Sequence, residues 1–138
     1  MHIINAEVDY EAFLYKFNAK ADQIPSRLSG AINKSALDGQ GIVKINAPVG
    51  VGTASPGNLR SATDVENRGL LERVIFPNID KAYYALFVIL GHLTRPFKKT
   101  HGQQRWVKGN DYFGKSMPQV RNVVEKNLKE FTDWLAEW

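Results

Sequence analysis

The chain has 138 residues, 43% of them hydrophobic and 23% charged, which is the balance of one globular domain over residues 1–138. It contains no cysteine, so disulfide scaffolds, thiol nucleophiles and cysteine-ligated metal sites are excluded. The net charge of +4 allows contact with an acidic partner without identifying one. Residues 1–9 have no basic segment followed by an apolar run, and the longest apolar stretch, 82–90, has about half the length of a membrane-spanning helix. We therefore expect synthesis in the cytoplasm and no contact with a membrane.

Helical periodicity dominates the first third of the chain. Apolar residues between 10 and 23 recur on one face and predict a first helix. Pro25 is expected to interrupt it, and Ser26 to cap a second segment over 28–46, so the two segments form a long, kinked N-terminal helix. Pro48 is expected to end this helix, because a proline disfavours helical geometry in the residue before it.

Glycines mark two features of this region. Gly39 and Gly41 lie within the predicted helix, where each costs about 1 kcal/mol relative to alanine, so we expect a close helix crossing or a kink there. A flexible, glycine-rich loop follows at 49–58. It lacks the lysine and Ser/Thr that a phosphate-binding loop requires, so nucleotide binding is not expected. Its glycines are Gly50, Gly52 and Gly57.

The middle of the chain predicts a small antiparallel sheet. Two strands are expected over 59–66 and 70–76, joined by a hairpin connection. The run 83–90 is almost continuously apolar and fits a central strand or a short helix, with Gly91 at its end. Residues 94–110 contain prolines, glycines and scattered basic residues, which predicts a second flexible loop or an irregular hairpin.

The last element is predicted to be an amphipathic helix that opens at Ser116 with Pro118. Its apolar residues recur at steps of three and four: Val120, Val123, Val124, Leu128, Phe131, Leu135 and Trp138. We expect Leu128 and Phe131 to be buried. The predicted fold is therefore α+β, with the N-terminal and C-terminal helices packed on a small antiparallel sheet.

No constellation of catalytic or metal-binding residues is evident. The three histidines lack the short spacing of a metal site, and no serine stands in a nucleophile motif, so neither a cofactor nor catalysis is expected. One alternative remains open, in which His92 and His101 meet in space as the general acid and base of a ribonuclease-like site.

Residues 81–110 concentrate positive charge. The segment has no acidic residue, and Phe97 and Trp106 are interleaved with the basic ones. Such a segment could bind a nucleic-acid backbone and stack bases, bind an acidic protein, or simply form a solvated connection that its aromatic residues anchor to the core. The basic residues are Lys81, Arg95, Lys98, Lys99, Arg105 and Lys108.

Several short motifs follow one another in a recognisable order. They are Ala47-Pro48-Val49 at a helix end, Gly57-Asn58-Leu59-Arg60-Ser61, Tyr84 and Ala85 with Val88 and Gly91, and Pro96-Phe97. In this order the chain resembles the siphophage tail-component family of head–tail joining, tail-completion and tail-terminator-like neck proteins. It departs from that pattern in a longer loop after Val49 and in Ile89, where the family commonly has Glu.

The resemblance implies a non-enzymatic structural virion protein of a tailed phage or prophage, located in the tail or neck after synthesis in the host bacterial cytoplasm. It implies a ring of identical subunits, hexameric in the family, whose partners are the tail-tube protein and the head-completion or connector proteins, with non-specific contact to DNA in the lumen. The alternative is a small basic nucleic-acid-binding or nuclease-like protein that uses residues 81–110. The candidate interface residues are Pro48, Gly50, Gly52, Gly57, Leu59, Arg60, Tyr84, Gly91, Pro96, Phe97, Lys98, Lys99, Arg105 and Trp106.

Overall fold

The computed structural model describes residues 10–49, 57–93 and 104–137. The elements, in chain order, are α1 (Tyr10–Asn46), α2 (Asn58–Ser61), β1 (Thr63–Asn67), β2 (Arg73–Pro77), α3 (Ala85–Leu90), β3 (Gly91–Leu93), β4 (Trp106–Lys108) and α4 (Tyr112–Ala136). The described strands form two antiparallel pairs, β1 with β2 and β3 with β4. The predicted α+β class, with a long N-terminal helix, a C-terminal helix and small antiparallel sheets, is confirmed.

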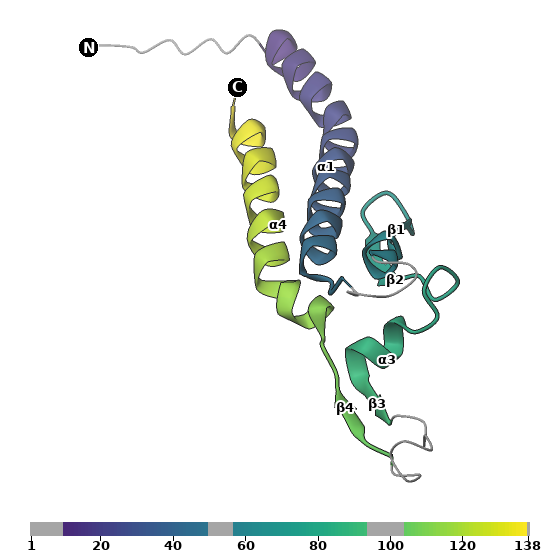
Figure 1. Cartoon of the computed structure of the whole chain (residues 1–138). Coiled ribbons are helices and arrows are strands. Elements are labelled where there is room, and N and C mark those ends of the chain that lie inside the picture. The colour runs from purple at the N-terminus through teal and green to yellow at the C-terminus, as the bar shows by residue number, and fades with distance from the viewer. Residues whose placement is uncertain (1–9, 50–56, 94–103, 138) are drawn as a thin grey trace, which may run out of the picture.

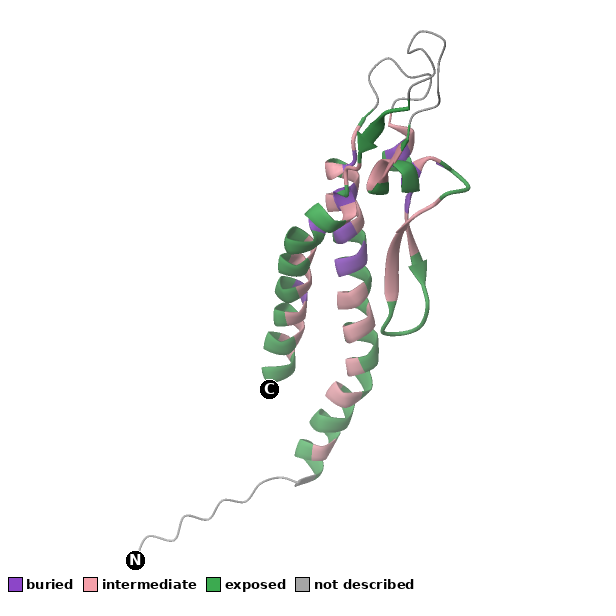
Figure 2. Ribbon diagram, turned by 90° about the horizontal axis from the view of Figure 1, so that it is seen from below, coloured by how far each residue is buried: buried purple, intermediate pink, exposed green. Residues whose placement is uncertain are grey.

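The two long helices pack mainly on each other instead of both lying on one sheet. They run side by side in Figure 1, and Figure 2 shows α1 flanked by α4 on one side and by the β1–β2 hairpin on the other. The apolar stripe of α4 therefore faces a helix and is partly buried by it, and the hairpin packs on a different part of α1. We call α1, α2, β1, β2 and α4 the body of the molecule.

Helix α1 continues through Pro25, so the predicted division into two segments was wrong. Pro25 is exposed, and water can hydrate the carbonyl that it leaves without a helical N–H partner. The turns on either side of it are held by the same residue of α4: the Lys20 Nζ atom lies 5.1 Å and the Arg27 guanidinium carbon 4.3 Å from the centre of a Trp134 ring. Tertiary contacts therefore bridge the weak point of the helix.

Gly39 lies where β2 and α4 both pack closely against α1. A Cβ atom there would lie 2.9 Å from the Cδ1 atom of Ile75 in β2 and 3.1 Å from the Cγ1 atom of Val120 in α4. The close crossing expected from the sequence is confirmed at this glycine. A Cβ on Gly41 would meet no heavy atom within 4 Å, so this glycine has no such role.

The predicted strand 59–66 begins as a helix. Leu59 and Ala62, three residues apart, are both buried, which the helical turn of α2 allows and an extended strand would not. The second strand starts at Arg73 instead of residue 70, because the connection is longer than expected and closes with a hydrogen bond from the Arg68 amide to the Glu72 carbonyl at 3.2 Å. Leu70 lies in that connection and is exposed.

Helix α4 starts at Tyr112, four residues before the predicted opening at Ser116. Asp111 is its N-cap, and the Asp111 Oδ1 atom accepts a hydrogen bond of 2.8 Å from the Gly114 amide. Ser116 is instead buried inside the helix, where its hydroxyl donates to the Tyr112 carbonyl. Pro118 lies within α4, whose axis bends near its beginning in Figure 1.

Residues 83–93 and 106–108 form a separate feature that we call the lobe. Residues 85–90 form helix α3, and β3 pairs with β4 in the register Gly91↔Lys108 and Leu93↔Trp106. The short-helix alternative is thus confirmed. Residues 106–108 pair with residues 91–93, while most of the predicted loop lies outside the described residues. Figure 1 shows the lobe beyond the end of α1, next to the beginning of α4.

The core is small and lies where the body meets the lobe. Eight apolar residues of the described chain are fully buried, and five of them are alanines, so few large side chains are removed from water. They are Ala36, Val43, Ala47, Leu59, Ala62, Ala82, Ala85 and Tyr112. Leu128 and Phe131, which were expected to be buried, are only half-buried.

Candidate assembly surface

The outer face of α3 is apolar and exposed to solvent. Leu86, Phe87 and Leu90 follow one another at the spacing of one helix face and are 47%, 54% and 71% exposed, and Tyr83, in the turn just before α3, is 78% exposed. The opposite side of α3 places Ala85 in the core. A helix that is apolar all round is normally buried on all sides, but the residues that the structure describes leave the outer face of this one open.

The β3–β4 hairpin adds further apolar side chains. Leu93 is paired across the strands with Trp106, so both side chains lie on the same face of the hairpin, and they are 57% and 63% exposed. The Phe87 ring lies edge-on to His92 of β3, with ring centres 6.0 Å apart, which joins α3 to the hairpin. We call Tyr83, Leu86, Phe87, Leu90, Leu93 and Trp106 together the apolar face of the lobe.

Two glycines allow the close packing of the lobe at its base. Gly91 has φ 83° and ψ 168°, and a Cβ atom there would lie 2.7 Å from the Val107 carbonyl oxygen. A Cβ on Gly109 would lie 2.7 Å from the Gly91 nitrogen. Beside them, the Asn110 amide donates to the Val88 carbonyl at 2.7 Å. These contacts fix α3 against the root of the hairpin, so the apolar face has a defined shape.

Basic residues border this face. Arg105, just before β4, and Lys108, at the end of β4, are both exposed. Lys81, just before the lobe, forms an ion pair of 2.9 Å with Asp64 of β1. Hydrogen bonds from Asn78 and then Lys81 hold the pKa of the Asp64 carboxyl below its ordinary value of 3.8. The positive charge at the base of the lobe is therefore partly matched, and the Lys108 side chain in β4 is exposed.

Most residues of the short sequence motifs converge on the junction between body and lobe. Arg60 donates to the carbonyl oxygens of Ile45 and Ala47 at 3.2 and 3.3 Å, which caps the end of α1. Leu59 lies in the core beside Ala85. These positions are explained by folding, so their side chains contribute to an interface only through the shape they maintain.

The other predicted interface residues have varied environments. Pro48 and Tyr84 are half-buried, Gly57 has a positive φ of 80° immediately before α2, and Gly91 lies at the base of the lobe. Arg105 and Trp106 are exposed in the lobe region. Six predicted residues lie outside the described chain: Gly50, Gly52, Pro96, Phe97, Lys98 and Lys99.

An apolar groove of about 640 Å³ crosses the body, and it was not predicted. Helix α1 supplies its floor with Ile32, Ala36 and Val43, while β2 and α4 supply its two walls. Met117 of α4 is 54% exposed there. Two charged residues of opposite sign also line the groove, Arg73 of β2 and Asp111 just before α4. The only sequence feature that could have indicated the groove is the apolar periodicity of α4, which predicted burial of that helix face against a sheet.

The contact between α1 and α4 contains two hydrogen-bonded polar pairs, at different positions along the helices. Asn127, which is 3% exposed, donates from Nδ2 to the Ser35 hydroxyl at 3.1 Å. Nearer the lobe, Asn46 Nδ2 donates to the Ser116 hydroxyl at 2.8 Å. A buried polar group without a partner costs about 1–3 kcal/mol, so sliding one helix along the other would break both pairs at that cost. The pairs therefore set the register of the two helices.

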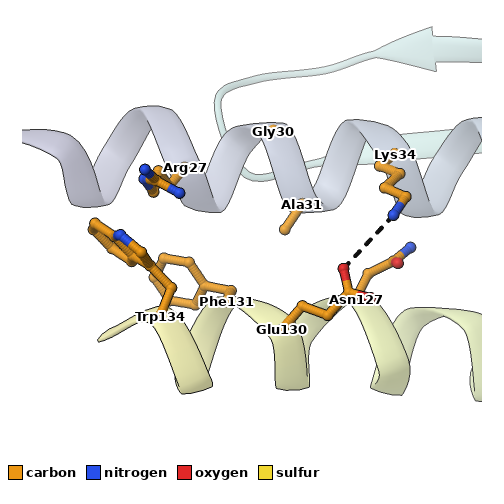
Figure 3. A pocket seen from close by; sticks show the side chains of 8 residues that line it. All are labelled: Arg27, Gly30, Ala31, Lys34, Asn127, Glu130, Phe131 and Trp134. Atoms are coloured by element: carbon orange, nitrogen blue, oxygen red, sulfur yellow. Dashed lines mark ion pairs between the residues drawn. The ribbon is translucent and has the colours of Figure 1, made fainter. Parts of the chain in front are cut away.

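A smaller hollow of about 210 Å³ lies farther along the same helix pair and is shown in Figure 3. Its charged residues already have partners: Lys34 and Glu130 form an ion pair of 3.6 Å, and Arg27 lies over Trp134. Side chains of α1 and α4 point toward each other across it in Figure 3. We interpret this hollow as a seam between packed helices and assign it no ligand.

Chemically reactive groups are sparse in the described chain. Within residues 10–49, 57–93 and 104–137, no three His, Cys, Asp or Glu side chains lie close enough to hold a metal ion. The His92 Nδ1 atom is buried and has no hydrogen-bond partner there. His101 lies outside the described residues, so the pairing of these two histidines stays a prediction. No helix in the described ranges is both long and apolar enough to cross a membrane.

Comparison with known proteins returns nothing that would extend this picture. No family model matches the chain, no curated protein matches it, and no solved structure matches it. Its function must therefore be argued from its own residues.

Proposed function

We propose that the protein is a structural assembly subunit that forms a ring at the end of a phage or prophage tail and joins it to the head connector. The observation that carries this proposal is the apolar face of the lobe, which is closely packed at its base and which residues 10–49, 57–93 and 104–137 leave exposed. Monomeric proteins rarely expose apolar patches of this kind unless the patch binds a partner. The order of the sequence motifs resembles that of the phage tail-component family, and this resemblance is the reason for proposing a ring at a tail end.

The proposal predicts self-association. We expect the purified protein to appear in native mass spectrometry as multiples of 15.5 kDa, and to bind tail-tube protein when the two are mixed. A protein that stays at 15.5 kDa at high concentration, both alone and with tail-tube protein, would contradict the proposal.

A second candidate function, nucleic-acid binding, is favoured by one feature. Trp106 is 63% exposed on the strand that ends at Lys108, next to Arg105, which is an arrangement that can stack a base and contact phosphates. A DNA or RNA titration at two salt concentrations separates the two functions. Assembly predicts weak binding to nucleic acid, whereas a monomer whose affinity falls steeply with salt would favour the second candidate.

A further inference from the structure

We propose that the lobe of one copy docks into the groove of the next copy, so that the assembly is built from head-to-tail contacts between two different surfaces. This inference rests on the proposed function, because it specifies how the subunits of the ring meet. A closed ring of identical subunits needs two distinct, complementary patches on each subunit. The described chain offers one projecting apolar surface and one concave apolar surface, and they lie in different places.

The geometry prevents the lobe from filling the groove of its own chain. The hydrogen bond from Asn110 to Val88 ties α3 to the chain just before α4, and Figure 1 shows the lobe beyond the end of α1. The groove runs back along α1 from Val43 to Ile32. A lobe that enters this groove must therefore belong to another molecule.

Size and polarity fit this contact. The groove has about 640 Å³, within the range of roughly 300–1,000 Å³ that pockets use to enclose ligands, so it can take several large side chains. Leu90 and Phe87 are the natural candidates, because they lie on the outer face of α3 and are both more than half exposed. Removing these side chains and the groove lining from water would be favourable on both sides.

Charge favours a second copy of this chain as the occupant. Residues 81–110 carry six basic residues and no acid, while the remainder carries twelve basic and fourteen acidic residues, a net charge of −2. The segment that contains the lobe is thus attracted to the remainder of a neighbouring copy and repelled by the same segment of another copy. This difference favours lobe-to-body contact over symmetric lobe-to-lobe contact.

A complementation experiment tests the proposal. Leu90→Glu changes the lobe and Met117→Glu changes the groove, both at exposed positions, while Leu37→Glu is a control at a 55% exposed leucine of α1 outside the groove lining. Native mass spectrometry should show the control assembling like the parent. Each of the other two variants alone should associate at least about thirtyfold more weakly.

The mixture of the two defective variants gives the decisive result. Leu90→Glu keeps an intact groove and Met117→Glu keeps an intact lobe, so an equimolar mixture should form dimers of twice 15.5 kDa and stop there. If the parent assembles but the mixture stays monomeric, the lobe-to-groove contact is wrong and the proposed function stands. If the parent itself remains monomeric, the proposed function fails and this inference fails with it.

Cross-linking provides a second readout that avoids charged substitutions. The chain has no cysteine, so single variants Leu90→Cys and Met117→Cys carry one thiol each. Oxidising their mixture should give the mixed disulfide well above either symmetric one, and Asp133→Cys, exposed on α4, should cross-link to neither. Symmetric Leu90→Cys dimers without the mixed product would overturn the proposal and indicate lobe-to-lobe contact.

Discussion

The body and the lobe differ in how their apolar side chains are buried. In the body, α1 and α4 cover each other and pair their buried polar groups, as Asn127 does with Ser35 and Asn46 with Ser116. In the lobe, Ala85 is buried and Tyr84 packs against the core, while Phe87 and Leu90 are more than half exposed. The buried contacts of the body are made within one chain, whereas its groove and the outer face of the lobe are apolar surfaces that the described chain leaves open.

The largest expected effect is the contrast between an aromatic residue of each region. Tyr112→Ala removes a side chain that is 1% exposed and should lower the free energy of unfolding by about 3–5 kcal/mol. Phe87→Ala removes one that is 54% exposed in the lobe, and we expect a change within about 0.5 kcal/mol for the monomer. Urea unfolding at a concentration that keeps the protein monomeric measures both. Similar losses for the two variants would remove the distinction between body and lobe.

The second prediction concerns the base of the lobe. Gly91→Ala places a side chain at φ 83°, ψ 168° and against the Val107 carbonyl, which should cost about 1–3 kcal/mol. Gly41→Ala, in an open part of α1, is the matched control and should be neutral or stabilising. Thermal unfolding of both variants checks the prediction. An unchanged midpoint for Gly91→Ala would mean that the lobe is not held as described.

These two regions also differ in how far the sequence predicts them. Periodicity locates the middle of α4 correctly, but Ser116 and Pro118 resemble a helix start while the true cap is Asp111. The expectation that Pro25 interrupts the helix was wrong. Lys20 and Arg27, on either side of the proline, both lie over Trp134, which is more than a hundred residues away in the sequence. Local rules cannot include such contacts.

The exposure of the lobe and the presence of the groove could not be predicted from the sequence, for a related reason. An apolar run such as 83–90 indicates burial, and no local pattern says whether the cover comes from the same chain or from a partner. The structure shows that the described chain covers only the inner side of α3. Interface positions therefore follow from the three-dimensional arrangement, while motif residues such as Arg60 turn out to hold the fold together.

A smaller effect should appear in the pH dependence of the body. Burial, and then the neighbouring Tyr84, raises the pKa of the Tyr112 hydroxyl above its ordinary value of 10.0. The hydroxyl therefore loses its proton at a lower pH in the unfolded chain than in the folded one. Above pH 10 the unfolded chain holds fewer protons than the folded one, so the free energy of unfolding falls as the pH rises. Tyr112→Phe should remove this alkaline loss. It also removes a buried hydroxyl with no partner in the described chain, so near neutral pH the variant should match or exceed the parent in denaturant unfolding.

The smallest expected effect on stability comes from the positive charge near the lobe. Reversing the charge of Lys98 and Lys99 to Glu should leave the thermal midpoint of the monomer unchanged, because the acid-free segment 81–110 gives these residues no nearby acidic partner in sequence. Assembly should weaken, because the attraction between a basic segment and an acidic neighbour is lost. A melt beside a tail-completion assay measures both. Normal melting with normal yields of joined particles would show that these charges have no role in assembly.

Amide hydrogen exchange of the assembled and dissociated protein tests most directly whether the lobe is the surface that assembly covers. We predict that amides of α3, β3 and β4 exchange at least about tenfold more slowly in the assembly, while amides of α1 before Arg27, which precede the groove lining, keep their rates. An assembly in which the amides of the lobe exchange as fast as in the monomer would contradict the account.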